Sequence, residues 1–433
     1  MNHPSSDASL QVWIDWLLSL HAQEIDLGLE RVAKVAKQLE IDRPAPFVIS
    51  VAGTNGKGSS VAMLSSILDA AGYSVGSYTS PHILRFNERI QLNGQVVEDQ
   101  QIIDAFLEIE LARNNTKLTY FEFSTLAALL IFKRQKMDVA VLEVGLGGRL
   151  DAVNLVDADA ALITAIDVDH IDWLGGDRSV IATEKAGITR ANKPAVCSDP
   201  NPPLSLFDFV VEHHVPLSSL KRDFDFQKTQ QAWSVQLNQA WPELEGRSLP
   251  FPALRGDFQL QNAAGVLALL NQIQPDLPVS VQAICGGLEK VKHPGRLQQL
   301  EVNEQAWLID VAHNPQSADA LAEYLAGSTN TQKYSAVFSV LNDKDSLPMV
   351  KTLAPWVDQW FIADLTIPRS SSIGELQALL MDAGISKDKI VALETIEEAT
   401  FTVAQLPEQP VLVWGSFFTV SQAFEALQSR DWV

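Results

Sequence analysis

The sequence has little cysteine and no long hydrophobic run. Only two cysteines occur in 433 residues, Cys197 and Cys285, and they lack metal-ligand spacing. This predicts a reducing cytoplasm without structural disulfides. No apolar run approaches the length of a membrane span. The apolar patch at 13–20 is interrupted by Asp15 and follows no basic region, so we expect an amphipathic first helix, no signal peptide and no membrane partner.

Basic residues are also few. The chain has 32 Lys and Arg against 53 Asp and Glu, which gives a formal net charge of −21. Nucleic-acid binding needs a basic face, so this balance argues against a nucleic-acid partner. If the ligands are nucleotides and carboxylates, the positive field must be local and come from a few placed lysines and arginines.

What the chain does contain is an alternation of helical and apolar strand patterns. Near-continuous apolar strands between helices predict a mostly parallel sheet covered on both faces. Residues 200–255 have no clean period and are expected to be irregular or a small antiparallel β segment. Expected helices lie at 10–39, 59–71, 99–113, 122–135 and 260–273, and expected strands at 47–52, 74–78, 139–144, 160–166, 307–311, 336–340, 359–362 and 411–414.

A glycine-rich turn with one lysine follows the first expected strand. Gly53-Thr54-Asn55-Gly56-Lys57-Gly58-Ser59 leads directly into a helical pattern. Glycines let backbone N–H groups close on an anion, the helix dipole favours negative charge, and Lys57 adds a point charge. The spacing departs from G-x-x-x-x-G-K-[ST], which argues against ordinary GTPases and motors but keeps phosphate binding. A flexible turn is the less favoured alternative.

Length and pattern together predict two domains. We expect an α/β fold with an N-terminal P-loop ATPase-type domain, containing the mostly parallel sheet, over residues 1–293. A smaller C-terminal Rossmann-like α/β domain is expected over 294–433, after a linker or hinge at 293–296.

Several polar residues end the expected strands of the first domain. Glu143 suits a magnesium ligand, with a buried pair to Arg149 as the alternative. His170 is a candidate ligand or a structural hydrogen-bonding group. Lys185 is a further candidate, in a helical pattern. The adjacent Glu184 is a poor ion-pair partner for it, because neighbours in sequence do not face each other on a helix. The alternative that Lys185 is a solvated helix lysine stays open.

The second domain offers a comparable cluster. Asp310 and His313 follow its first strand and are expected to face a cleft between the domains, which Arg296 can also reach. In the first domain, Tyr120-Phe121-Glu122 is either an aromatic wall with a polar edge or a helix cap with core aromatics.

Taken together, these residues resemble the folylpolyglutamate synthase/dihydrofolate synthase family of the ATP-dependent Mur ligase superfamily. The resemblance covers essentially the whole chain, and its strength lies in the order and spacing of nine motifs. These are 25–32, Gly53–Ser59, Thr79–His82, Leu118–Glu122, Leu142–Ala152, Asp169-His170, Glu184–Ile188, Pro294–Arg296 and Asp310–Pro315.

The resemblance implies roles for individual residues. It implies Mg²⁺ ligation by Ser80, Glu143 and His170, carbamylation of Lys185 near the metal, and a K⁺ ion as an optional second cation. It implies catalytic roles for Lys57, His170 and Lys185. It implies ATP binding by Gly56, Lys57, Gly58, Ser59, Asn262, Arg296, Asp310 and His313, and binding of a pterin-bearing substrate by Ile25, Asp26, Leu27, Thr119, Tyr120, Phe121, Glu122, Leu150, Asp151 and Ala152. One departure is Phe258, where many relatives carry histidine before Gln259.

The implied activity is ATP-dependent ligation of L-glutamate to dihydropteroate and to tetrahydrofolates through an acyl phosphate. Alternatives are another Mur-superfamily amino-acid ligase, a monofunctional folylpolyglutamate synthase, or a nucleotide-dependent switch without ligase activity. We expect a cytoplasmic monomer.

Overall fold

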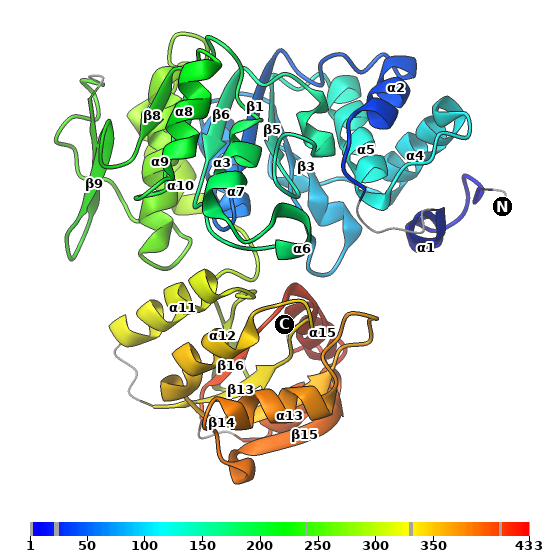
Figure 1. Cartoon of the computed structure of the whole chain (residues 1–433), viewed down its shortest axis with the longest axis vertical. Helices are drawn as coiled ribbons and strands as arrows, with labels where there is room; N and C mark the ends of the chain where they lie inside the picture. The colour runs from blue at the N-terminus through cyan, green and yellow to red at the C-terminus, as the bar shows by residue number, and fades with distance from the viewer. Residues whose placement is uncertain (1–2, 21–25, 239–240, 329–331, 407–408, 433) are drawn as a thin grey trace. The chain divides into compact units, whose positions relative to one another are not determined.

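The computed structural model describes residues 3–20, 26–238, 241–328, 332–406 and 409–432. The chain divides into two compact units, and Figure 1 shows the elements of each. The first contains 1–81, 86–253 and 259–292; the second contains 82–85, 254–258 and 293–433. No helix among the described residues is both long and apolar enough to cross a membrane.

An eight-stranded sheet forms the centre of the first unit. Six neighbouring strands, β2, β5, β1, β6, β7 and β8, run parallel. At the β2 edge the sheet is extended by β3 and β4, which pair antiparallel. The order is β4 (Gln95–Val96), β3 (Ile90–Leu92), β2 (Val75–Tyr78), β5 (Val139–Glu143), β1 (Phe47–Ala52), β6 (Ala160–Ile163), β7 (Ala195–Cys197) and β8 (Leu217–Ser219). The strand β1 therefore lies between β5 and β6, so the loops that follow these three strands meet at one edge of the sheet.

Helices pack against the central strands. The helix α3 contacts β1, β2 and β5 and in turn packs on α10, while α1 and α2 pack on α4 and α5. The bounds are α1 (Leu10–Leu20), α2 (Glu30–Gln38), α3 (Lys57–Ala70), α4 (Asp99–Arg113), α5 (Tyr120–Gln135), α6 (Ile171–Leu174), α7 (Arg178–Ala186), α8 (Leu204–Glu212), α9 (Phe258–Gln272) and α10 (Val281–Lys290). Central strands such as β5 are buried along their whole length, which accounts for their unbroken apolar sequence.

The second unit is a six-stranded sheet with helices on both faces. Its order is β11 (Gln298–Val302), β12 (Gln305–Ile309), β16 (Val411–Trp414), β13 (Tyr334–Phe338), β14 (Val357–Asp364) and β15 (Ile390–Thr395), with only β11 antiparallel. One core contains α11 (Pro315–Gly327), α12 (Ser346–Leu353) and α13 (Ile373–Asp382); the other contains α14 (Ile396–Val403) and α15 (Phe417–Gln428). The predicted fold class is confirmed.

Some expected elements are corrected. The single helix predicted at 10–39 is wrong, because α1 ends at Leu20 and α2 starts at Glu30, after Gly28 with a φ of +151°. The strand predicted at 160–166 is shorter, since β6 ends at Ile163. Between 200 and 255 the antiparallel alternative is confirmed by the ribbon of β9 (Phe224–Lys228) and β10 (Trp233–Leu237), but the segment also holds α8, which the prolines around it obscured.

Candidate active site

The glycine-rich loop connects the end of β1 to the start of α3. Gly53 has a φ of +155°, and a Cβ there would lie 1.8 Å from Thr164 Oγ1, so only glycine fits. Gly56 has a φ of +89° and precedes the first residue of α3, Lys57. The Lys57 ammonium donates to the carbonyls of Gly53 at 3.0 Å and Thr54 at 3.1 Å. The loop thus places a cation and a helix N-terminus at the same point.

A polar chain of side chains links α9 to this loop. Gln259 Nε2 donates to Ser59 Oγ at 3.1 Å, and Asn262 Nδ2 donates to Gln259 Oε1 at 3.0 Å. Gln259 and Asn262 are both buried. Asn262 therefore lies beside the predicted phosphate site, whereas sequence analysis gave Gln259 no role.

Glu143 is the last residue of β5 and is 4% exposed. Its Oε2 accepts a hydrogen bond from the Ser80 backbone N–H at 3.1 Å, so two of the predicted metal ligands are adjacent. The alternative pairing of Glu143 with Arg149 is wrong, because Arg149 forms an ion pair of 2.8 Å with Glu184. Among the described residues, no group of three or more His, Cys, Asp or Glu side chains could hold a metal. A metal here would depend on the serine and lysine of the predicted set as well.

Lys185 is buried on α7, so the alternative of a solvated lysine is wrong. Burial, together with the charge of Lys57, lowers its pKa to about 7 against the opposing effects of Asp169 and Asp151. The loop after β5 covers this part of α7: a Cβ on Gly148 would lie 2.5 Å from the Glu184 carbonyl oxygen. A large fraction of Lys185 is consequently a neutral amine at neutral pH.

His170 follows β6 by seven residues and caps the short helix α6 with a φ of +52°. Its backbone N–H donates to Asp169 Oδ1 at 2.7 Å. His170 is half-buried. This left-handed conformation at a non-glycine residue is uncommon and occurs often at functional positions.

Two of the predicted pterin-binding residues, Asp26 and Glu122, bind the same arginine. Arg31 Nη1 pairs with Asp26 Oδ2 at 2.7 Å, and Arg31 Nε pairs with Glu122 Oε1 at 2.8 Å. Thr119 and Glu122 form a capping box at the start of α5, which confirms the helix-cap interpretation. Sequence analysis did not assign Arg31 a role, although it lies within the motif at 25–32. Ile25 lies outside the described residues, and Leu27 is half-buried.

Aromatic side chains lie next to this cluster. Tyr120 is half-buried, with the Arg89 guanidinium 5.2 Å from its ring centroid. A Cβ on Gly145 would lie 2.6 Å from the Phe121 ring, so Phe121 packs directly on the loop after β5. The segment therefore has the helix cap and aromatic side chains packed against the core, and the wall toward a substrate stays a prediction.

The side chain of Asp151 binds backbone N–H groups of the loop after β5, to which it belongs. One carboxylate oxygen accepts from the Leu146 N–H at 2.8 Å and the other from the Val153 N–H at 2.9 Å. Burial raises its pKa to about 6, against these hydrogen bonds. Its neighbours Leu150 and Ala152 lie in the same loop, and the Leu150 carbonyl accepts from the Gly28 N–H at 3.3 Å.

The second unit has its own polar cluster, at the carboxyl end of β12. The buried carboxylate of Asp310 accepts the backbone N–H groups of Leu297 and Ala312, each at 2.8 Å, and burial raises its pKa. The Arg296 guanidinium lies 5.0 Å from the Phe417 ring centroid, and the centroid of the His313 ring lies 5.7 Å from that of the same phenylalanine. Phe417, which sequence analysis missed, thus joins two predicted ATP-binding residues.

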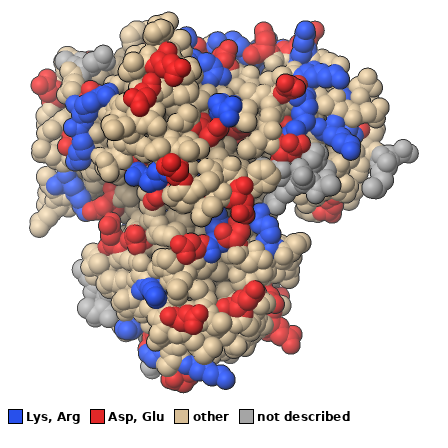
Figure 2. All heavy atoms as spheres, in the orientation of Figure 1, with Lys and Arg blue, Asp and Glu red and all other residues tan. Residues whose placement is uncertain are grey.

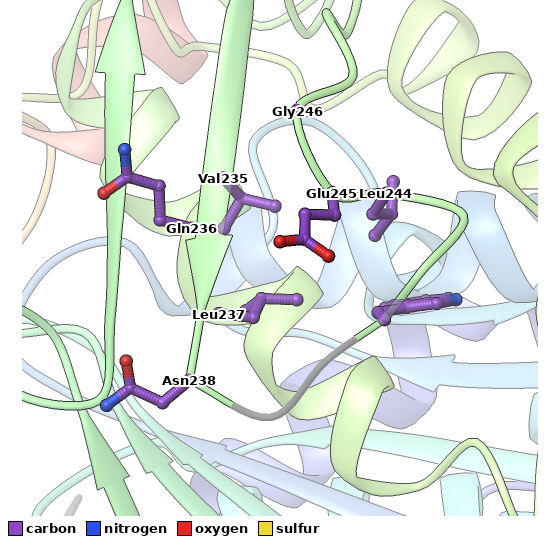
Figure 3. Close-up of a pocket in the computed structure, with 8 residues that line it drawn as sticks. Val235, Gln236, Leu237, Asn238, Leu244, Glu245 and Gly246 are labelled. Carbon is purple, nitrogen blue, oxygen red and sulfur yellow. The ribbon is translucent and has the colours of Figure 1, made fainter.

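Surface charge and one hollow lie away from the predicted site residues. On the face in Figure 2, Lys and Arg side chains are interspersed with Asp and Glu. A hollow of about 250 Å³ lies beside β10 (Figure 3). It is lined by Val235, Gln236, Leu237, Asn238, Trp241, Leu244, Glu245 and Gly246, and none of these is a predicted site residue.

Comparison with known proteins accounts for this arrangement. Residues 51–270 match the Mur ligase middle domain, and residues 295–417 match the Mur ligase glutamate ligase domain. The chain is 41% identical over 427 residues to the dihydrofolate synthase/folylpolyglutamate synthase of Escherichia coli strain K12, covering 99% of this chain and 97% of that protein.

Solved structures agree. E. coli FolC in complex with DHPP and ADP superposes with a TM-score of 0.90 at 39% identity, covering 99% of both chains. A bifunctional folylpolyglutamate synthase/dihydrofolate synthase with Mn, AMPPNP and L-glutamate bound has a TM-score of 0.88 at 40% identity, covering 99% of this chain and all of the other. The chain belongs to the dihydrofolate synthase/folylpolyglutamate synthase family of ATP-dependent Mur ligases.

Proposed function

We propose that this chain ligates L-glutamate to dihydropteroate, giving dihydrofolate, and extends tetrahydrofolates with further glutamates. The observation that carries the proposal is the juxtaposition of the phosphate loop with the buried Lys185, whose pKa responds to the charge of Lys57. A phosphate loop that carries its own cation, Lys57, suits a reaction that brings two anions together. The names of the relatives, the DHPP and ADP bound to E. coli FolC, and the L-glutamate bound to a second relative support the same chemistry.

In the first step, the carboxylate of the acceptor attacks the γ-phosphate of ATP, the bond from the γ-phosphorus to the ADP oxygen breaks, and ADP leaves, which gives an acyl phosphate. In the second, the neutral glutamate amine attacks the acyl carbon, the bond to the phosphate oxygen breaks, and loss of phosphate and of a proton from the nitrogen gives an amide. The chain's task in the first step is to align two anions and offset their repulsion. At an effective dielectric constant near 20, one cation about 4 Å from an oxyanion contributes on the order of 4 kcal/mol before desolvation costs. Lys57 and Arg296 are the proposed cations.

The ATP-binding residues follow from the same proposal. Gly56, Lys57, Gly58 and Ser59 bind the phosphates, with Asn262 beside them. Arg296, Asp310 and His313 of the second unit also bind ATP. Residues 1–293 then act as the ATP-binding and central ligase domain, and 294–433 as the Rossmann-like domain.

The metal is proposed to be Mg²⁺, held by Ser80, Glu143 and His170 with carbamylated Lys185, and K⁺ is an optional second cation. The donor chemistry fits, because a buried carboxylate lies beside Ser80 and hard cations prefer oxygen ligands. A neutral Lys185 amine is the form that combines with CO₂, and the resulting carbamate supplies an anionic oxygen. When bound, the metal would supply charge neutralisation at the phosphates.

The acceptor binds through Asp26, Leu27, Thr119, Tyr120, Phe121, Glu122, Leu150, Asp151 and Ala152, with Ile25 completing the set. A flat pterin ring needs apolar contacts, which Tyr120 and Phe121 offer, and polar atoms at its edge. The expected cytoplasmic location and monomeric state stay predictions.

The test is a ligation assay with purified protein, ATP and L-glutamate, using dihydropteroate or tetrahydrofolate as acceptor. We expect phosphate release that requires glutamate and either acceptor. Lys57→Ala should lower kcat about 100-fold or more, and Glu143→Gln should raise the metal requirement, while Lys34→Ala on the exposed side of α2 should behave as wild type. Activity with tetrahydrofolate alone would indicate a monofunctional synthase, and phosphate release without an acceptor would indicate a nucleotide switch.

A further inference from the structure

Two side chains outside the predicted site hold the segment that leads to His170. Both backbone polar groups of Ile166, in the loop after β6, bind side chains. Its N–H donates to Asp199 Oδ2 at 2.7 Å, and its carbonyl accepts from Arg178 Nε at 2.9 Å. Asp199 is 3% exposed, and its carboxylate lies 3.6 Å from Arg178 Nη2.

The same two side chains repeat this pattern on the loop after β7. The Asn201 N–H donates to Asp199 Oδ1 at 2.7 Å, and its carbonyl accepts from Arg178 Nη2 at 3.2 Å. The Arg178–Asp199 pair therefore connects three segments: the loop after β6, the loop after β7 and the start of α7. Four backbone groups depend on it.

The opposite side of the β6 loop is held by the phosphate loop. Thr54 Oγ1 accepts from the Asp167 N–H at 3.0 Å and donates to the Asp167 carbonyl at 2.8 Å. The Thr54 N–H donates to the Ala165 carbonyl at 2.6 Å. Residues 165–167 are thus fixed between the phosphate loop and the Arg178–Asp199 pair.

This location connects the two elements that carry proposed metal ligands. His170 lies four residues after Ile166. Lys185 lies seven residues after Arg178 on α7, about two helical turns along it. Because Arg178 is the first residue of α7 and binds the Ile166 carbonyl, it fixes the start of the Lys185 helix against the His170 loop.

We propose that Arg178 and Asp199 are positioning residues that set the placement of His170 relative to Lys185 and thereby the affinity for the divalent metal. The inference rests on the proposed function, in which those two residues serve the metal. Arg178 and Asp199 contact neither substrate nor metal in this scheme. They act through backbone hydrogen bonds to Ile166 and Asn201. Loss of the partners that bind metal-ligating side chains directly commonly lowers metal affinity about 10- to 100-fold, which sets the scale for the effect expected here.

If Arg178 and Asp199 had a purely structural role, replacing them would lower stability without changing metal affinity. The chain offers a matched control for this alternative. Asp159 precedes β6 at its other end, accepts the Val48 N–H at 3.0 Å and pairs with Lys193 at 3.0 Å. Like Asp199 it is a carboxylate that accepts a backbone N–H group, in its case from Val48 of β1. Asp159→Asn and Asp199→Asn therefore make the same chemical change, the first just before β6 and the second in the loop after β7, where Asp199 binds the loop after β6.

The experiment titrates Mn²⁺ into each full-length variant with saturating ADP and follows free Mn²⁺ by EPR, alongside thermal melting. Asp199→Asn should raise the Mn²⁺ concentration for half-saturation about 10-fold or more, because its amide leaves either the Ile166 or the Asn201 N–H without an acceptor. Arg178→Met should do the same and Arg178→Lys less, which keeps the test usable if one variant does not fold. Asp159→Asn should lower Tm but bind Mn²⁺ as wild type.

Two results would overturn the proposal in distinguishable ways. If His170→Ala and Glu143→Gln bind Mn²⁺ as wild type, the proposed metal site is wrong and the positioning role falls with it. If those variants lose Mn²⁺ but folded Asp199→Asn and Arg178→Met bind normally, or if Asp159→Asn loses as much, only the positioning role is wrong.

Discussion

Gly56 and Asn262 approach so closely that a Cβ on Gly56 would lie 2.4 Å from Asn262 Oδ1. Because Gly56 also has a φ of +89°, a side chain there meets both backbone strain and a collision. This contact joins the phosphate loop to α9, which is about 200 residues later in the sequence.

We predict that Gly56→Ala displaces Asn262 and disrupts the phosphate loop. Its ADP affinity, measured by calorimetry, should fall at least 10-fold. Gly72→Ala is the matched control, since Gly72 has a φ of +94° but a Cβ there would have no neighbour within 4 Å. Both variants should lose about 1–2 kcal/mol of stability, because alanine is strained in the left-handed backbone conformation. Only Gly56→Ala should also lose affinity for ADP. Equal ADP affinity in both would contradict the role of the contact.

Lys185 should carry CO₂. Carbamate forms on the neutral amine, so with a pKa of about 7 its formation should increase as the pH rises through that value. With ¹³C-labelled bicarbonate, wild type should give a carbamate signal by NMR that Lys185→Ala lacks. The variant should be inactive and partly restored by short carboxylic acids. An unchanged spectrum in Lys185→Ala would remove the assignment.

The same lysine makes a prediction for stability measured without CO₂. Between pH 7 and 10.5 the unfolded chain binds a proton at Lys185 that the folded chain does not, so this group makes stability rise with pH over that window. Below pH 7 both states are protonated and the slope from this group vanishes. The unfolding free energy of wild type should therefore rise relative to that of Lys185→Met from pH 7 toward pH 10.

Asp151 should affect dihydropteroate more than tetrahydrofolate if the two acceptors bind in different poses. Its carboxylate holds the loop after β5 when ionised, above its pKa of about 6. The ratio of kcat/KM for dihydropteroate to that for tetrahydrofolate should fall as pH drops through 6, and Asp151→Asn should show a low ratio at every pH. Using the ratio cancels the titration of Lys185, which serves both reactions. A pH-independent ratio shared by wild type and variant would mean one common pose.

Arg31→Met should raise KM for dihydropteroate and destabilise the fold by about 1–3 kcal/mol, because the buried Glu122 loses its cationic partner. The comparison is Arg134→Met, which breaks the exposed ion pair with Glu108 and should cost less than about 1 kcal/mol without changing KM. Urea unfolding and steady-state kinetics on both variants decide the matter. A KM unaffected by loss of Arg31 would separate this cluster from the substrate.

Strong local patterns explain what the sequence predicted well. The strand at 47–52 and the helix at 99–113 were placed with correct bounds, because buried strands and helices have distinct periods. The strands β3 and β4 were missed because three and two residues are too few to show an alternation.

Long-range packing explains what the sequence could not give. Lys185 has the local surroundings of a surface helix residue, yet it is buried, and the loop around Gly148 packs on α7 at this point. Arg31 and Glu122 are 91 positions apart in the sequence, so their pairing cannot be predicted from the local sequence around either residue. Phe417 follows a strand end like many core aromatics, and its contacts with Arg296 and His313 arise only in the folded second unit.

The register of three parallel strands has a consequence for how samples of this protein should be judged. Val51 on β1 is aligned with Glu143 on β5 and with Leu162 on β6. Side chains alternate between faces along a strand, so a slip of one residue between β1 and β5 would turn Glu143 to the other face and present Leu142 or Val144 in its place. Such a molecule would keep its sheet and its circular dichroism spectrum, but it would be inactive because Glu143 would no longer lie in the site. The number of nucleotide sites per chain, counted by titration, would therefore measure the fraction of correctly aligned molecules better than spectroscopy could.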